Sequence, residues 1–241
     1  MSESGPPARG RYLGRGVRVA VIDSGVHARH PHVGGVAGGV AFDTQGRAHD
    51  DFVDRLGHGT AVTAVIREKA PLAEIHAVKV FDRELRTEMD ALLAALDWTV
   101  EQGMALVNLS LGTPERRHEE ALRSRVERAV GKGVLVVTAW RSSEGEPLLP
   151  GSLPGVLPVE LDWSCPRDEV RGFAGEDGSW LCRASGYPRP APGVPPERNL
   201  KGVSFAVANV TGCLARLQDG GIPLRVADAQ RLLTGGDRSP D

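Results

Sequence analysis

The chain has 241 residues, 41% of them hydrophobic, and a formal net charge of -2, so it can bury the core of one large α/β domain or two small ones. This composition excludes an intrinsically disordered chain, and the charge balance gives no electrostatic reason to expect nucleic acid or an anionic membrane as partner. No apolar run approaches the ~20 residues of a membrane-spanning helix. The polar start lacks the apolar stretch of a secretory signal, and the three cysteines show no metal-ligand spacing, so we expect a cytoplasmic protein with reduced cysteines.

Strands and helices are predicted to alternate along most of the chain. Residues 1–15 are rich in Gly, Pro and Arg and predict a flexible arm in front of a domain that spans residues 16–241. The apolar, β-branched run at 17–22 ends at an Asp-Ser-Gly turn signal and predicts a buried strand, whereas residues 27–57 show no clear period and predict mainly loop. Further helices are predicted at 59–66, 86–102, 114–133, 204–217 and 226–233, and further strands at 75–80, 104–108 and 134–137.

This alternation predicts the fold class. Strands that alternate with helices form a parallel sheet covered by helices on both faces, which is an α/β architecture. Residues 141–200 interrupt the pattern with many Pro and Gly residues and predict short strands and long loops. Because the chain shows no internal repeat and no linker, we expect a single α/β domain with a mostly parallel sheet.

Three reactive side chains fall at the ends of predicted elements. Asp23 directly follows the strand at 17–22, and His58 and Ser204 each open a helix. An acid, an imidazole and a hydroxyl are the minimum set for acyl transfer, because a histidine must take the proton of the serine and a carboxylate must fix the histidine tautomer. A serine at the start of a helix also has free backbone N–H groups beside it that can receive an oxyanion. These residues therefore indicate nucleophilic catalysis by a serine.

Four motifs follow one another in chain order: Asp-Ser-Gly-Val at 23–26, Gly-His-Gly-Thr at 57–60, Asn-Leu-Ser-Leu-Gly at 108–112 and Gly-Val-Ser-Phe-Ala at 202–206. In this order the chain resembles the subtilisin-like serine peptidase family over residues 17–212. The resemblance implies a subtilisin-like fold in which Asp23 orients the imidazole, His58 acts as general base and then acid, and Ser204 is the nucleophile. The resemblance also implies that Ser110, Leu111 and Gly112 form the edge to which a peptide substrate would add as a strand.

The chain departs from the family pattern in two loops. Where the family has an asparagine whose amide donates to the oxyanion, this chain has Ser142, so we expect a shorter hydroxyl donor and slower turnover. Trp140 would lie beside the substrate groove, where it either walls the specificity pocket or packs under the loop. The calcium-binding loop that follows the histidine helix in the family is missing, because residues 66–71 pass straight into the next strand. We therefore expect no metal and no cofactor.

Other polar side chains have simpler structural interpretations. His27, His30 and His32 could suggest a metal site, but their loop-like spacing lacks cysteine or a matching downstream cluster and favours a surface loop. Asp54 is interpreted as a solvated charge, with attraction of basic substrate residues as the alternative. Asp23 alone could merely cap its strand in an Asx-turn, so its functional meaning depends on the motifs taken together.

The sequence thus predicts a serine endopeptidase that hydrolyses peptide bonds through an acyl-enzyme on Ser204. Its partner would be a peptide or protein substrate, and neither nucleic acid nor a membrane is expected. Because no inhibitory prodomain is recognisable before residue 17, we expect a cytoplasmic enzyme that processes a precursor or leader peptide, with a partner protein from the same biosynthetic pathway. Two alternatives stay open: a catalytically impaired fold that binds peptides or acts as a scaffold, and ligation or macrocyclisation by the same residues.

Overall fold

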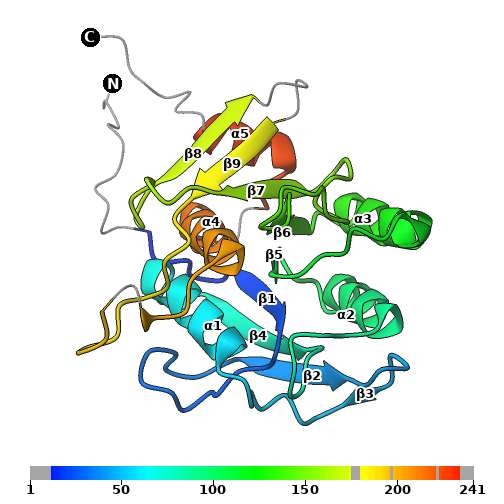
Figure 1. Ribbon diagram of the computed structural model, residues 1–241, viewed down its shortest axis with the longest axis horizontal. Helices are drawn as coiled ribbons and strands as arrows, with labels where there is room; N and C mark the ends of the chain where they lie inside the picture. Colours follow the sequence, from blue (N-terminus) through cyan, green and yellow to red (C-terminus); the bar gives the residue numbers. More distant parts are fainter. Residues whose placement is uncertain (1–11, 175–179, 196–197, 221–222, 234–241) are drawn as a thin grey trace.

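The computed structural model describes residues 12–174, 180–195, 198–220 and 223–233, and the strands in these ranges form one nine-stranded sheet (Figure 1). The strands are β1 (Arg18–Asp23), β2 (Gly38–Phe42), β3 (Ala48–His49), β4 (Glu74–Lys79), β5 (Leu106–Leu109), β6 (Leu135–Ala139), β7 (Leu157–Leu161), β8 (Val170–Ala174) and β9 (Trp180–Ala184). Their order across the sheet is β3-β2-β4-β1-β5-β6-β7-β9-β8. All neighbouring pairs are parallel except the two edge pairs, β2 with β3 and β8 with β9.

The centre of the sheet places three strand ends side by side. β1 lies between β4 and β5, with Val21 opposite Ala77 on one side and Asn108 on the other. Parallel strands end at the same edge of a sheet, so the residues that follow β1, β4 and β5 meet at its carboxyl edge. This edge is where open α/β sheets carry their sites.

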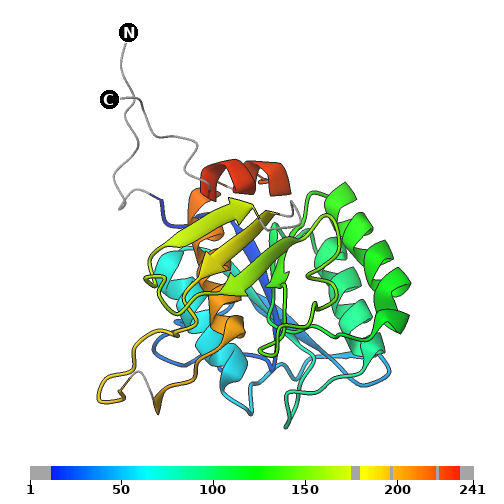
Figure 2. The same ribbon diagram turned by 45° about the horizontal axis from the view of Figure 1, so that its top comes forward.

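Helices cover both faces of the sheet (Figures 1 and 2). They are α1 (His58–Lys69), α2 (Met89–Glu101), α3 (Glu119–Gly131), α4 (Val203–Leu217) and α5 (Val226–Leu233). Alternate residues of β1 point to opposite faces: Val19 and Val21 join the core under α1 and α4, whereas Ala20 and Ile22 join the core under α2 and α3. The first cluster therefore holds α1 and α4 on one face of the sheet, and the second holds α2 and α3 on the other face.

The structure confirms the predicted α/β architecture, a mostly parallel sheet with helices on both faces. One prediction was wrong: the segment 27–57, expected to be mainly loop, contains β2 and β3. Two helix starts also differ. The helix predicted at 86–102 begins at Met89, and the one predicted from residue 114 opens with a 3-10 turn at Arg116–His118 before α3.

Part of the predicted N-terminal arm contacts the domain. The Leu13 carbonyl accepts a hydrogen bond from the Leu72 N–H at 2.9 Å, and the Arg15 N–H donates to Asp219. These contacts attach residues 13–15 to the folded domain, whereas residues 1–11 lie outside the described residues. Within the described ranges, no helix combines the length and the apolar character needed to cross a bilayer.

Candidate active site

A hydrogen bond joins Asp23 to His58 at the carboxyl edge of the sheet. Asp23 ends β1 and is fully buried, and its Oδ1 lies 2.7 Å from Nδ1 of His58, the first residue of α1. A carboxylate only accepts hydrogen bonds, so Nδ1 carries the hydrogen and the neutral ring keeps its lone pair on Nε2. The Ser24 backbone N–H donates to the same Oδ1, also at 2.7 Å, whereas the second carboxylate oxygen of Asp23 is buried without a partner among the described residues. The imidazole and this N–H together compensate the buried carboxylate.

Two glycines allow the close approach of β1 and α1. A Cβ on Gly59 would lie 2.2 Å from the Gly25 carbonyl oxygen and 3.2 Å from the Cβ of Asp23. Gly25 itself has φ of 92°, a conformation that L side chains rarely adopt, and a Cβ there would lie 2.3 Å from the Phe52 carbonyl oxygen. The Asp-Ser-Gly and Gly-His-Gly motifs therefore bring the carboxylate and the imidazole into contact.

Asp54 organises the loop in front of α1. Its Oδ1 accepts hydrogen bonds from the Ser24 hydroxyl and from the backbone N–H groups of Leu56 and Gly57, at 2.8–2.9 Å. Its Oδ2 accepts from both the N–H and the hydroxyl of Thr60, at 2.9 and 2.6 Å. Asp54 is only 9% exposed, so its interpretation as a solvated charge was wrong. Burial alone would raise the pKa of Asp54, but these donors outweigh it and hold the pKa below its usual range.

The surroundings of His58 favour its protonated form. Burial lowers the pKa of His58, but the hydrogen bond and charge of Asp23, together with the charge of Asp54, outweigh it and raise the pKa above the ordinary value of 6.5. A raised pKa makes the ring a stronger base. The imidazole is thus suited to accept a proton at Nε2 and to be stabilised by Asp23 once it is charged.

Ser204 lies in the first turn of α4, where backbone N–H groups have no partner within the helix. Its hydroxyl donates to the Ser110 carbonyl oxygen at 3.4 Å. Ser204 and His58 line the same pocket, which has a volume of about 240 Å³ and which we call the serine pocket. The structure therefore brings together Asp23, His58 and Ser204, which stand far apart in the sequence.

The serine pocket contains the predicted peptide edge and several residues that sequence reasoning missed. Ser110, Leu111 and Gly112 line it, and their role in substrate binding stays a prediction. Its remaining lining residues, none of them charged, are Phe81, Leu85, Ala139, Leu148 and Val203. Val203 lies in the motif at 202–206, but Phe81, Leu85, Ala139 and Leu148 come from segments that are distant in the sequence and carry no motif. Only the apolar character of such residues could have pointed to the pocket.

The hairpin at 140–148 separates two predicted site residues from this pocket. Its base pairs the Trp140 carbonyl with the Leu148 N–H at 2.9 Å, so Ala139 and Leu148 line the pocket while Trp140 does not. The Arg141 guanidinium instead stacks on the Trp140 ring at 3.8 Å. Near the tip, the Ser142 hydroxyl accepts from the N–H groups of Glu144 and Glu146, each at 3.2 Å. Roles for Trp140 in substrate binding and for Ser142 in the oxyanion hole stay predictions.

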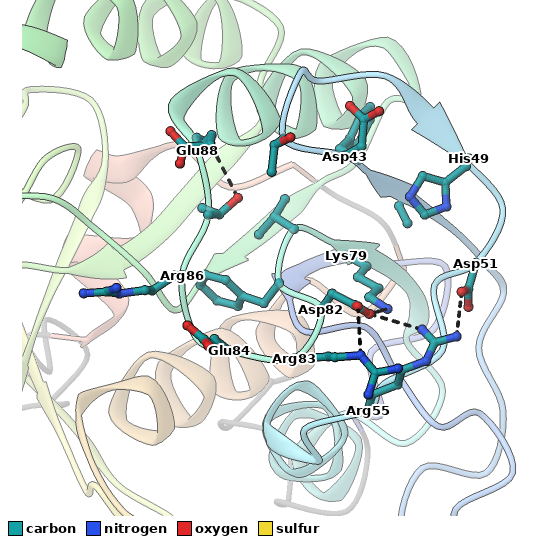
Figure 3. A pocket seen from close by; sticks show the side chains of 16 residues that line it. Asp43, His49, Asp51, Arg55, Lys79, Asp82, Arg83, Glu84, Arg86 and Glu88 are labelled. Atoms are coloured by element: carbon teal, nitrogen blue, oxygen red, sulfur yellow. Dashed lines mark hydrogen bonds and ion pairs between the residues drawn. The ribbon is translucent and has the colours of Figure 1, made fainter.

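Ion pairs join the loop before α1 to the loop after β4. Lys79, the last residue of β4, is buried, and its Nζ donates to the Val53 carbonyl at 3.1 Å and to Asp82 at 2.7 Å. Arg55 donates to Asp51 at 2.7 Å and to the same oxygen of Asp82 at 3.3 Å (Figure 3). A charged pocket of about 740 Å³ is lined by Asp51, Arg55, Lys79 and Asp82, and their contacts tie the loop before α1 to the loop after β4.

In the ranges that the structure describes, no group of three or more His, Cys, Asp or Glu side chains is arranged to hold a metal ion. His27, His30 and His32 nevertheless lie together, since all three line one further pocket of about 520 Å³.

The fold and the site define a class: an α/β domain with an acid, an imidazole and a serine hydroxyl at the carboxyl edge of a parallel sheet. Comparison with known proteins gives the family. The protein-family model described as "Subtilase family" matches residues 14–146, which are more than half of the chain. The chain therefore belongs to that family.

Individual relatives agree with this assignment. Subtilisin from Bacillus pumilus is 30% identical over 210 residues, which cover 83% of this chain and 73% of the relative. Subtilisin BL from Lederbergia lenta is 37% identical over 148 residues, or 57% and 52% of the two chains. Subtilisin E from Bacillus subtilis is 33% identical over 137 residues, and that match spans only about a third of its length, 35%.

Solved structures show the same fold. A cold adapted subtilisin-like serine proteinase superposes with a TM-score of 0.68 at 23% identity, covering 93% of this chain and 83% of that one. Sphericase gives a TM-score of 0.69 at 22% identity, covering 92% and 83%. The predicted subtilisin-like fold is confirmed.

Proposed function

We propose that this protein is a serine endopeptidase that hydrolyses peptide bonds through an acyl-enzyme on Ser204. The observation that carries the proposal is the 2.7 Å contact of Asp23 with His58 at the pocket that also holds the Ser204 hydroxyl. Family membership supports the same reaction, because the names of the relatives denote peptidases.

The residues have defined roles in this reaction. Nε2 of His58 takes the proton of the Ser204 hydroxyl as its oxygen attacks the scissile carbonyl carbon, and Asp23 stabilises the imidazolium that forms. The carbonyl oxygen becomes an oxyanion, which accepts a hydrogen bond from the Ser204 N–H at the start of α4. The imidazolium then protonates the leaving amine. Water repeats the sequence on the acyl-enzyme and releases the acid product.

The serine pocket indicates which acyl groups fit. A substrate strand along Ser110, Leu111 and Gly112 presents its scissile carbonyl to Ser204. The side chain of the residue that carries this carbonyl enters a space walled by Ala139, Leu148 and Val203. Apart from His58, no titratable side chain in the described part of the chain lines this pocket. We therefore infer that an apolar residue precedes the cleaved bond. A narrow substrate of this kind suits the processing of a precursor or leader peptide, and we propose that it takes place in the cytoplasm.

Covalent labelling tests the proposal. A fluorophosphonate probe reacts at a useful rate only with an activated serine, so the protein is expected to be labelled and the Ser204→Ala variant is not. Ser164→Ala, at an exposed serine whose hydroxyl donates to Asp162, is the matched control and keeps full labelling. Absence of labelling in the unmodified protein would favour the catalytically impaired peptide-binding alternative. The mass of the product separates hydrolysis from ligation or macrocyclisation, which share the same labelled serine.

A further inference from the structure

The pocket that contains the three histidines, which we call the histidine pocket, lies beside the start of α1. It has a volume of about 520 Å³ between the loop at 27–32, the first turn of α1 and the segment 188–191. Its polar lining residues include His27, His30, His32, Asp54, Arg189 and Asn199. Gly57 and Thr60, on either side of His58 in the sequence, also line it.

The histidine pocket and the serine pocket lie on different sides of His58. In Figure 1 the segment between β9 and α4, drawn in gold, lies to the left of α1, whereas β5 and α2 lie to its right. The serine pocket contains Ser110, Leu111 and Gly112, which directly follow β5 and with which the acyl part of a substrate strand would pair. Beyond the cleaved bond, the substrate chain must leave this edge and pass His58. The leaving-group residues are thereby directed toward the histidine pocket.

The charges of the histidine pocket favour an anionic group. Among the described residues that line it, Asp54 is the only carboxylate, and both oxygens of Asp54 already accept hydrogen bonds from Ser24, Leu56, Gly57 and Thr60. The Arg189 guanidinium donates only a long hydrogen bond, 3.4 Å, to the His32 carbonyl oxygen, and no carboxylate in the described ranges pairs with it. A half-buried guanidinium without an acidic partner retains several donors for a ligand.

The imidazoles add neutral donors beside this guanidinium. Nδ1 of His30 accepts a hydrogen bond from the His32 N–H at 3.2 Å, so a neutral His30 ring carries its hydrogen on Nε2. Burial lowers the pKa of His32, and the charge of Arg189 lowers it further, so this ring is neutral near pH 7 and offers one N–H. Guanidinium and imidazole donors around one space match the two oxygens of a carboxylate.

We propose that the histidine pocket binds a carboxylate of the substrate on the leaving-group side of the cleaved bond, with Arg189 as the residue that determines this specificity. The inference rests on the peptidase function proposed above. The carboxylate belongs either to an Asp or Glu side chain or to the free C-terminus of a short leaving peptide, and both have the same hydrogen-bonding chemistry.

Matched peptides test the carboxylate and its source. The substrates share one acyl half and carry a single Glu or Gln at the first, second or third leaving-group position, each with a C-terminal amide. A further pair ends after two leaving-group residues, as free acid or as amide. The expected result is a kcat/KM about tenfold higher for a Glu peptide than for its Gln counterpart, or for the acid over the amide, equivalent to about 1.4 kcal/mol.

Variants assign the preference to Arg189. Arg189→Gln is expected to reduce the ratio to about twofold or less, by slowing only the carboxylate substrate. Arg198→Gln, at an exposed arginine outside the pocket lining, is the control and preserves the tenfold ratio. Equal rates for all pairs, or a preference that survives Arg189→Gln, would overturn the proposal.

A binding experiment separates this inference from the proposed function. The Ser204→Ala variant is titrated calorimetrically with leaving-group peptides that contain Glu or Gln. If the fluorophosphonate does not label the protein but Ser204→Ala binds the Glu peptide about tenfold tighter through Arg189, only the peptidase proposal is wrong. If labelling is intact but the two peptides bind equally, only the carboxylate site is wrong.

Discussion

The two halves of the candidate site are built in different ways. On one side, Asp23 and His58 stand on a framework of side-chain hydrogen bonds, five of which end on Asp54. On the other side, the Ser204 hydroxyl makes one hydrogen bond of 3.4 Å, and the hairpin at 140–148 uses its polar groups to close its own turn. His58 is therefore positioned by the fold, whereas the donors that we propose for the oxyanion are mainly backbone N–H groups of α4.

This difference shows which side of the site is held rigidly by the fold and which side tolerates substitution. A base must be oriented before any substrate arrives, and side chains that pair with each other hold it without the substrate's help. Donors to the oxyanion can be added or removed on a surface hairpin without disturbing the sheet. Substitutions on the first side are expected to alter stability and activity together, and substitutions on the second side to alter turnover alone.

The largest effect is expected from breaking the framework at its centre. Asp54→Ala leaves five donors without their acceptor, and hydrogen bonds to a charged, buried group stabilise strongly, so the free energy of unfolding should fall by about 3 kcal/mol. Denaturant unfolding measures this loss. Asp51→Ala removes an exposed ion pair with Arg55 and should cost less than about 1 kcal/mol. Equal costs for both variants would show that Asp54 is not the centre of this framework.

A smaller effect, of opposite sign, is expected from strengthening the sparse side. Ser142→Asn supplies a longer amide donor at the hairpin and should raise kcat about tenfold, or about 1.4 kcal/mol, with little change in KM. Steady-state kinetics on a cleaved peptide measures both constants. Ser143→Asn, one residue further along the exposed hairpin, tests the register. If neither substitution raises kcat, the oxyanion takes its second donor from elsewhere.

The pH dependence of kcat/KM should report on the protonation of His58, and we expect kcat/KM to change severalfold. His58 accepts a proton only when it is neutral, so kcat/KM is lost as pH falls through its raised pKa, and the midpoint lies above 6.5. Asp54→Asn removes one of the negative charges that raise this pKa, so the midpoint should move to lower pH. Asp51→Asn, whose charge does not contribute to the shift, should leave it in place. A midpoint that moves upward in Asp54→Asn would contradict this account.

The smallest effect concerns metal removal. The Arg67 guanidinium, near the end of α1, donates to the carbonyl oxygens of Pro71 and Ala73 in the short connection between α1 and β4. It also donates to the carbonyl oxygens of Val33 and Gly35. These are oxygens of the kind that a calcium ion would bind. A chelator is therefore expected to leave Tm unchanged in a thermal scan. Loss of a tightly bound cation would remove about 2.7 kcal/mol and lower Tm by more than about 5 °C.

The sequence predicts those parts of the molecule whose residues are constrained locally. The strand at 17–22 and the helices of His58 and Ser204 follow from apolar runs that end at glycine-rich turns, and the structure places β1, α1 and α4 there. By contrast, β2 escapes a periodicity argument because it begins Gly38-Gly39 and so carries little side-chain pattern. A Cβ on Gly39 would lie 2.7 Å from the ring of Phe52, so the strand has a glycine where that ring packs against it.

The walls of the site are less predictable than its reactive groups. Leu148 reaches the serine pocket because the neighbouring Leu149 pairs with Thr113, the residue after Gly112, at 2.8 and 3.0 Å. Nothing in the local sequence of Leu148 indicates this pairing. The burial of Asp54 was missed for a similar reason, because its donors include Ser24, which lies thirty residues earlier. Contacts of this kind are decided by tertiary structure and leave no local pattern.

The hydrogen bonds of Asp54 also have a consequence for how this sequence can change over generations. The polar groups of Ser24, Asp54 and Thr60 are hydrogen-bond partners, with Asp54 as the acceptor. Replacing any one of them therefore leaves buried polar groups of the others without a partner. Their substitution effects are non-additive, because the second and third replacements remove partners that are already lost. The three positions therefore form a single heritable unit. A lineage can keep all three or exchange all three, while each intermediate carries a less stable protein.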